Sequence, residues 1–200
     1  IVQPAVMKAI TTKKERSIRM PYSPLSLPQW IKIVFPIAVT IISSIVSPES
    51  APLVGMLMFG NLIRECKVLE NLSLCAQNTL SPLITLLLGL SISPMMKGEN
   101  LLKKETLMII SFGLFAFLLD IALGIFFIKV VNFFLPKEKK VNPLIGGAGI
   151  SAFPMSSRIV EKMGLEYDKQ NHLLPYALGA NVSGQIASAI SGGIILSMFL

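Results

Sequence analysis

The sequence predicts an all-α protein, a polytopic bundle of transmembrane helices of which some are broken or re-entrant. The first observation is composition, because 52% of the 200 residues are hydrophobic, only 14% are charged, and the mean hydropathy is +0.68. The second is a series of apolar runs of the length that crosses a bilayer. The third is that proline and glycine interrupt several of these runs. We expect residues 1–200 to form a single membrane domain.

The charge pattern argues against a nucleic-acid-binding protein, although the net charge is +7. The basic residues form short clusters between apolar runs, as they do in the cytoplasmic loops of membrane proteins. No interleaving of aromatic and basic residues suggests an RNA-binding surface. Cys66 and Cys75 are too few for a disulfide framework, and no cysteine–histidine spacing indicates zinc.

The first 29 residues read as the end of one helix followed by a loop. Residues 1–10 are apolar and resemble the tail of a preceding membrane helix, and the chain starts there without Met, so we expect an upstream part to be missing. Residues 11–29 form a basic loop, which the distribution of positive charge favours on the cytoplasmic face. Its charged residues include Lys13, Lys14, Arg16 and Arg19.

The next third of the chain predicts two spans with shorter elements between them. Residues 30–46 form the first complete span, with Trp30 at its interfacial end. Residues 51–63 are short for a span and are expected to be re-entrant or half of a broken helix. Residues 64–75 mix charged and apolar side chains and suit an amphipathic interfacial helix. Residues 76–92 form the next span.

The last two long apolar runs are residues 106–135 and 173–200. The first contains Asp120, and a carboxylate inside a membrane is a functional candidate by default, although a hydrogen bond to a neighbouring helix would also explain it. The second has small residues at four-residue spacing, which favours close helix packing. These are Ala180, Gly184, Ser188 and Gly192.

Residues 142–158, N-P-L-I-G-G-A-G-I-S-A-F-P-M-S-S-R, are the strongest candidate for a site. The segment is apolar enough for a bilayer, but two prolines and three glycines oppose a regular helix. Backbone of this kind is tolerated at membrane depth only where protein or a water-filled cavity satisfies its polar groups. We therefore expect a broken-helix site segment, against the plainer alternative of a loop between spans. A polar loop should follow it as far as His172, which we expect to be a solvated loop residue rather than a catalytic one.

The polar groups in and near this segment are mainly neutral oxygen donors. Carboxamides of Asn142 and Asn181 and hydroxyls of Ser151 and Ser188 would suit a small hard cation, and Na⁺ fits better than a transition metal. Asn181 could equally form an interhelical hydrogen bond. Arg158 and a helix N-terminus would instead favour an anion or a carboxylate. The chemistry is thus that of a site where a cation and a carboxylated group meet.

At these residues the chain resembles a known family, the β subunit of the sodium-translocating, biotin-dependent decarboxylases. The family includes oxaloacetate, methylmalonyl-CoA, glutaconyl-CoA and malonate decarboxylase systems. The resemblance rests on residues 142–158 with Lys162-Met163-Gly164, on G-M-L-M-F-G-N-L-I-R-E-C at residues 55–66, and on H-L-L-P-Y-A-L-G-A-N-V-S-G at residues 172–184. It covers nearly the whole chain, which corresponds to the C-terminal half of the family's subunit.

The resemblance implies one half of an inverted-repeat, transporter-like fold in a bacterial or archaeal cytoplasmic membrane, crossed several times. The function it implies is that of an enzyme's membrane subunit, which couples carboxybiotin decarboxylation to Na⁺ export. Implied partners are a biotin-carrying carboxyltransferase (α) subunit, a small membrane (γ) subunit and lipid, and we expect a homo-oligomer within the complex. The fragment alone should be inactive. The alternatives are a Na⁺-coupled carboxylate transporter without decarboxylation, and a membrane subunit that only anchors partners.

The resemblance also implies roles for individual residues. Asn142 and Ser151 would help to bind Na⁺ or relay the proton, and Ser151 would also take part in catalysis. Gly146 and, from residue chemistry rather than the resemblance, Asn181 complete the predicted Na⁺ ligands. Gly146 would permit a close backbone approach. Arg158 would be catalytic and would hold the carboxylate of carboxybiotin. The family's key aspartate, in an Asp-Gly-Pro context, belongs to the other half of the subunit, and Asp120 does not replace it.

Overall fold

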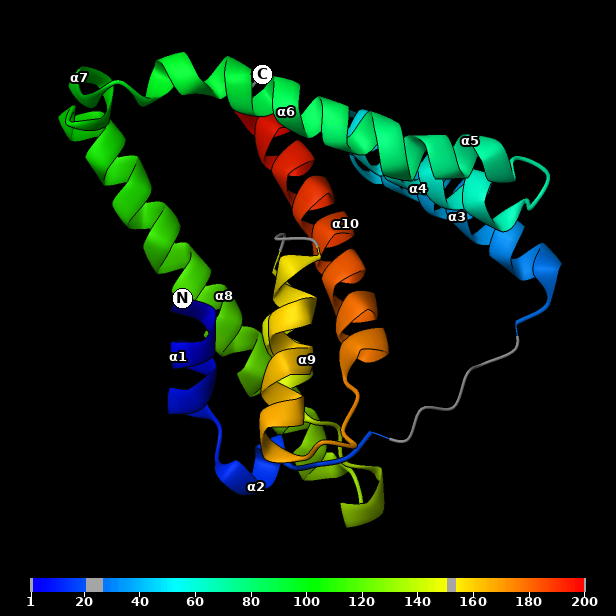
Figure 1. Ribbon diagram of the computed structural model, residues 1–200, viewed down its shortest axis with the longest axis vertical. Helices are drawn as coiled ribbons and strands as arrows, with labels where there is room; N and C mark the ends of the chain where they lie inside the picture. The colour runs from blue at the N-terminus through cyan, green and yellow to red at the C-terminus, as the bar shows by residue number, and fades with distance from the viewer. Residues whose placement is uncertain (1, 21–26, 151–153, 200) are drawn as a thin grey trace. The chain divides into compact units, whose positions relative to one another are not determined.

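The computed structural model describes residues 2–20, 27–150 and 154–199, and every regular element in them is helical (Figure 1). Four helices in this part of the chain are long and apolar enough to cross a membrane, which confirms the predicted all-α membrane class. Their bounds are Gln29–Val46, Glu70–Ile92, Lys104–Phe134 and Leu174–Phe199. The chain forms two compact units, Ile1–Pro24 with Ser111–Ser188, and Leu25–Ile110 with Ala189–Leu200.

The first unit contains the predicted site segment. Its elements are α1 (Val2–Ile10), α2 (Lys13–Arg16), α8 (Lys104–Phe134) from Ser111 onward, the short 3₁₀ helices η4 (Lys137–Lys139) and η5 (Pro143–Ala148), α9 (Met155–Tyr167), and α10 (Leu174–Phe199) as far as Ser188. Residues 2–10 are thus helical, and of the described residues of the basic loop, 11–20 and 27–29, only Lys13–Arg16 and Gln29 are helical.

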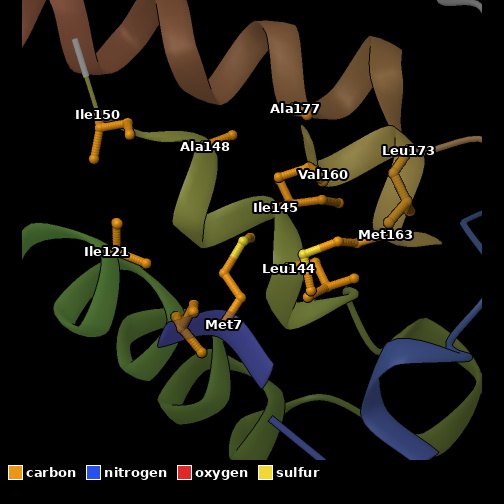
Figure 2. Packing of buried hydrophobic residues seen from close by; sticks show 11 residues of the cluster. Met7, Ile121, Leu144, Ile145, Ala148, Ile150, Val160, Met163, Leu173 and Ala177 are labelled. Carbon is orange, nitrogen blue, oxygen red and sulfur yellow. The ribbon is translucent and has the colours of Figure 1, made fainter. Parts of the chain in front are cut away.

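A single apolar cluster holds these elements together (Figure 2). Met7 of α1, Ile121 of α8 and Leu144 of η5 are fully buried and point into one space, which Val160 of α9 and Ala177 of α10 close. Because the side chains come from five elements far apart in sequence, burial of this apolar surface fixes η5 between helices rather than leaving it as a free loop.

The basic segment is folded against the rest of the first unit. Thr12 and Glu15 form a capping box at α2, which satisfies two backbone amides at the start of the helix. Arg16 is buried, stacks over the Tyr167 ring at 4.7 Å and donates to the carbonyl of Thr11 at 2.7 Å. Asp168 pairs with Arg19. Residues 11–20 of the predicted loop are therefore held against the first unit by the side chains of Arg16 and Arg19.

The second unit is built on a helical hairpin in which α3 (Gln29–Val46) packs against α4 (Ala51–Glu65). The short 3₁₀ helix η1 (Pro48–Ser50) joins them. α4 has 15 residues and is too short for a span, as predicted. Lys67 then takes a left-handed conformation, with φ of 58°, and ends this hairpin.

The prediction of one amphipathic interfacial helix over residues 64–75 is wrong, because α4 ends at Glu65 and the next helix begins at Glu70. α5 (Glu70–Cys75) continues through a π-helical turn η2 (Ala76–Leu80) into α6 (Ser81–Ile92), and together they form one candidate span of 23 residues. Pro82 lies inside this continuous helix, directly after the π turn, and has no amide hydrogen to donate. The π turn before it absorbs the change of register. The short helices η3 (Ser93–Met96) and α7 (Gly98–Leu101) follow.

Candidate functional site

Within residues 142–158 the structure describes two separate helical elements. η5 covers Pro143–Ala148, and α9 begins at Met155. The Asn142 side chain accepts from the Leu144 amide at 3.0 Å and caps η5, and Pro143 follows at a position that lacks a helical donor. Ser151, one of the predicted site residues, lies outside the described residues.

Helices approach the interrupted segment closely on two sides, through pairs of glycines. A Cβ atom on Gly146 would overlap the backbone of Gly124 in α8, and the reverse is also true. A Cβ atom on Gly184 of α10 would overlap the carbonyl of Gly149. The close backbone approach expected at Gly146 is therefore present, and the small residues of α10 serve packing at Gly184, whereas Gly192 has open space.

Asn181 of α10 lies at the centre of a cluster of oxygen atoms from η5, Ile150 and α9. Its side chain is fully buried. The two hydrogens of Nδ2 are shared among three oxygens within hydrogen-bond distance, the Ala148 carbonyl at 2.9 Å, the Ile150 carbonyl, and the Ser156 hydroxyl at 3.0 Å. The Oδ1 atom, equally buried, has no hydrogen-bond partner. An unpaired buried acceptor is costly and points to a ligand that the amide oxygen can bind.

Asn142 occupies the opposite end of η5 from this cluster. Its Nδ2 group donates to the carbonyls of Arg16 and Ile18, both at 2.9 Å, so both amide hydrogens are used. Since a 3₁₀ helix rises ~2 Å per residue, the six residues of η5 span roughly 12 Å between Asn142 and Ala148, which Asn181 contacts. The structure brings Asn181 to Ser156, and it does not bring Asn142 to either of them.

The predicted charged residues are exposed. Arg158 lies in the first turn of α9 and has no hydrogen-bonding or ionic side-chain partner among the described residues. Asp120 lies on an exposed part of α8, likewise without a partner in the described chain. Ser188 is exposed on α10. Of these three, Arg158 is the one that belongs to the interrupted segment, as its last residue.

The prediction of a polar loop from Arg158 to His172 is wrong, because residues 155–167 form α9. This helix is amphipathic, and it buries Val160, Met163 and Gly164 at helical spacing. Its charged face lowers its mean hydropathy and conceals the pattern in a membrane protein. Only residues 168–173 are a loop, and His172 in that loop is exposed as expected, although Glu161 contacts it at 2.9 Å.

Several buried polar residues at the site were not singled out from the sequence. Ser156 contributes its hydroxyl to the Asn181 cluster and donates to Ala148 at 3.1 Å. Gln3 of α1 donates to the Gly147 carbonyl at 3.0 Å. Asn171 donates to the carbonyl of Ile18 at 3.0 Å, next to Asn142. A glutamine inside an apolar run was a usable signal for Gln3.

Two carboxylates of the first unit have pKa values below their ordinary range. Burial alone would raise the pKa of Glu15, but hydrogen bonds from Thr12 and Lys129 outweigh it, and the pKa falls. The hydrogen bond from Arg19 lowers the pKa of Asp168, and the Gln170 amide adds to the effect. Both residues therefore stay ionised and tie the basic segment to α8 and to the loop after α9.

Comparisons with known proteins place this arrangement in a family. Residues 1–199 match the family described as the Na⁺-transporting oxaloacetate decarboxylase beta subunit. An oxaloacetate decarboxylase beta chain of Haemophilus ducreyi is 45% identical over 98% of this chain and 44% of its own length. That of Klebsiella pneumoniae is 44% identical over 100% and 46%.

A methylmalonyl-CoA decarboxylase subunit beta of Propionigenium modestum is 44% identical over 100% of this chain and 50% of its own length. The chain therefore spans about half the length of the curated relatives that it matches. Because the family match covers residues 1–199, it includes both compact units and the interrupted segment between Asn142 and Arg158. The chain belongs to the family of Na⁺-transporting oxaloacetate decarboxylase beta subunits.

Proposed function

We propose that this chain is part of the membrane subunit of a biotin-dependent decarboxylase, which couples the decarboxylation of carboxybiotin to Na⁺ export across a bacterial or archaeal cytoplasmic membrane. The observation that carries the proposal is the buried oxygen cluster around Asn181 in a chain of this family. The biotin is carried by a carboxyltransferase (α) subunit, and a small membrane (γ) subunit and further copies of this subunit complete the complex.

The oxygen cluster has the composition of a Na⁺ site. The carbonyls of Ala148 and Ile150 and the hydroxyl of Ser156 now accept from the Asn181 amide. Rotation of that amide would turn Oδ1 toward the same three oxygens and replace two N–H donors with a fourth ligand. Four neutral oxygens suit a hard monovalent cation, and a neutral site can release its ion more readily than a charged one. Asn142 and Gly146 act from η5, where Gly146 holds the segment against α8.

Arg158 is the residue we assign to the carboxylate of carboxybiotin. It is exposed in the first turn of α9, where the helix N-terminus adds positive potential. In the reaction the N–C bond of the N-carboxylate breaks, CO₂ leaves, and the biotin nitrogen takes a proton. Ser151 would relay that proton. Neutralising the carboxylate by Arg158 favours binding, and its release as CO₂ frees the guanidinium for the next cycle.

The experiment is sodium uptake into proteoliposomes that contain the native complex in inverted orientation, supplied with candidate acids, with and without avidin. We expect uptake that requires substrate and is abolished by avidin. Uptake that follows a carboxylate gradient and ignores avidin would instead establish a Na⁺-coupled carboxylate transporter. An anchoring subunit would be indicated if Asn181→Ala left uptake unchanged.

Within the same assay, Asn181→Ala tests the cation site and Arg158→Lys tests the carboxylate site. Asn181→Ala removes one oxygen ligand, so we expect the Na⁺ concentration for half-maximal uptake to rise about tenfold. Arg158→Lys keeps the charge but loses the planar fork, and we expect weaker binding of the carboxylated carrier with unchanged Na⁺ dependence. Ser183→Ala on the exposed side of α10 is the matched control.

A further inference from the structure

Glu161 of α9 makes an unusual pair of contacts for a carboxylate of this unit. One oxygen, Oε2, accepts from the Leu174 backbone amide at 2.7 Å, and the other, Oε1, lies 2.9 Å from Nδ1 of His172. Leu174 is the first residue of α10, so Glu161 supplies that helix with an N-terminal cap from a different helix. Its side chain is 18% exposed, and that of His172 is 65% exposed.

This contact is the first of three that fasten α9 to α10. Ser157 donates to the Ala177 carbonyl at 2.9 Å, and Asn181 donates to the Ser156 hydroxyl at 3.0 Å. The contacts run toward lower residue numbers along α9 and toward higher residue numbers along α10, so the two helices are antiparallel, as Figure 1 shows. Glu161 is the charged member of the three and the one farthest from the oxygen cluster.

The same contact withholds a counter-ion from Arg158. Residues three apart on a helix are neighbours, so Glu161 is within reach of Arg158 by position. In this unit Glu15, Glu166 and Asp168 all pair with cationic side chains, Lys129, Lys8 and Arg19. Glu161 instead turns toward α10. Arg158, and Lys162 one turn further on, have no side-chain partner in the described part of the chain.

We infer that Glu161 is a positioning residue, which fixes the start of α10 against α9 and by the same contact keeps the Arg158 guanidinium free for an incoming carboxylate. The inference rests on the role of Arg158 given under the proposed function. It predicts that the hydrogen bond to Leu174, and not the negative charge, is what the site requires of residue 161.

Three substitutions separate these requirements. Glu161→Gln keeps the length and an oxygen that accepts from Leu174, and it removes the charge. Glu161→Asp keeps the charge but is shorter by one carbon–carbon bond, about 1.5 Å, so it loses hydrogen-bond reach to α10 and leaves a carboxylate near Arg158. Glu161→Ala removes both. Glu166→Asp on the same helix is the matched control, because Glu166 pairs with Lys8 and not with α10.

The first measurement is decarboxylation by the native complex over a range of carrier concentrations. We expect Glu161→Gln and Glu166→Asp within about threefold of the parent, and Glu161→Asp to raise KM for the carboxylated carrier at least about tenfold, with a smaller effect on kcat. Glu161→Ala should fall between them. If the carboxylate acted only through its charge, Glu161→Asp would keep the parent KM and Glu161→Gln would raise it, which is the reverse of the result expected here.

The second measurement follows Arg158 itself, through its rate of modification by phenylglyoxal, resolved by mass spectrometry in the same complex. We expect modification of Arg158 to slow about fivefold in Glu161→Asp, since a paired guanidinium is less available, and to be unchanged in Glu161→Gln. Equal rates in these two variants, or a Gln variant as impaired as Asp, would overturn the inference. Slowed modification in a complex that proves independent of biotin would support the inference and reject the proposed function.

Discussion

At the scale of the residue, two glycine contacts decide how the site is assembled. Gly124 meets Gly146, and Gly184 meets Gly149, in each case without room for a Cβ atom. Glycines inside α8 and α10 weaken those helices, and the close approach of backbones is what offsets this cost. The sequence indicated Gly184 as a packing residue through its four-residue spacing, but nothing local distinguishes it from Gly192, which has no neighbour within 4 Å.

Gly184→Ala tests this distinction. The added methyl group would overlap the Gly149 carbonyl, and we expect the overpacked variant to lose about 1–3 kcal/mol of stability. The measurement is the midpoint of thermal unfolding of the complex in detergent, together with Na⁺ dependence of uptake, because the displaced carbonyl lies next to Ile150 of the oxygen cluster.

Gly179→Ala is the control for that prediction, since Gly179 lies on the same helix and an added Cβ atom there would have no neighbour within 4 Å outside its own helical backbone. There the higher helix propensity of alanine should leave the stability unchanged or raise it by up to about 1 kcal/mol. Equal unfolding midpoints in the Gly184→Ala and Gly179→Ala variants would show that the contact with Gly149 is not tight.

At the scale of the element, two asparagines that bind the same backbone carbonyls join the basic segment, residues 11–20, to the interrupted segment. Asn142 and Asn171, one from each end of the α9 region, both donate to the carbonyls of Arg16 and Ile18. Asn171 also accepts from the Met20 amide at 3.3 Å. Non-helical backbone needs such partners when it is buried, and the asparagine amides supply them.

Asn171→Ala should therefore loosen the basic segment. It removes the acceptor of the Met20 amide and one donor to the Ile18 carbonyl, and we expect a loss of about 1–3 kcal/mol in local stability. Hydrogen exchange measured by mass spectrometry should show faster exchange at Met20. Gln170→Ala, which alters an exposed side chain, should leave that rate unchanged, and a similar acceleration in both variants would contradict the role of Asn171.

The elements that the sequence predicted are those with a strong local signal. The spans over residues 30–46, 106–135 and 173–200 follow from apolar length, and the break after Asn142 follows from Pro143 and the glycines. α9 was missed because a helix with one charged and one buried face has no net apolar signal. The carbonyls that accept from Asn142 lie 124 and 126 positions away, and the oxygens around Asn181 lie 25 to 33 positions away, so no local pattern encodes these contacts.

At the scale of the whole molecule, the positions of the charged residues say more about their roles than the net charge of +7 does. In the first unit the acidic side chains bind the basic segment and α1 to α8 and to the region of α9. Arg158 and Lys162 of α9 have no charged side-chain partner in the described part of the chain, so no acidic residue there neutralises them. The excess of positive charge is thus partly structural and partly, on the proposed function, a means of attracting a carboxylated carrier.

This arrangement predicts that acid will destabilise the first unit. The pKa values of Glu15 and Asp168 in the folded chain lie below their ordinary values of 4.5 and 3.8. A carboxylate with a lowered pKa binds fewer protons in the native than in the unfolded state, so stability rises with pH across that range. The contribution of each residue is complete above its ordinary value and is lost as the pH falls through its native pKa.

The measurement is hydrogen exchange in the basic segment and α1 as the pH is lowered from about 5 to about 3, corrected for the intrinsic pH dependence of exchange. We expect protection to fall over this range. In the double variant Glu15→Gln and Asp168→Asn, protection should be lower at the upper end and nearly independent of pH, because the titrating groups are gone. Lys129 of α8 pairs with Glu15 at 3.0 Å and also donates to the Ile10 carbonyl at 2.7 Å. When the pair with Glu15 is lost, protection should therefore also fall around Ile10, at the end of α1. A pH dependence as steep in the double variant as in the parent would mean that other carboxylates hold this unit together.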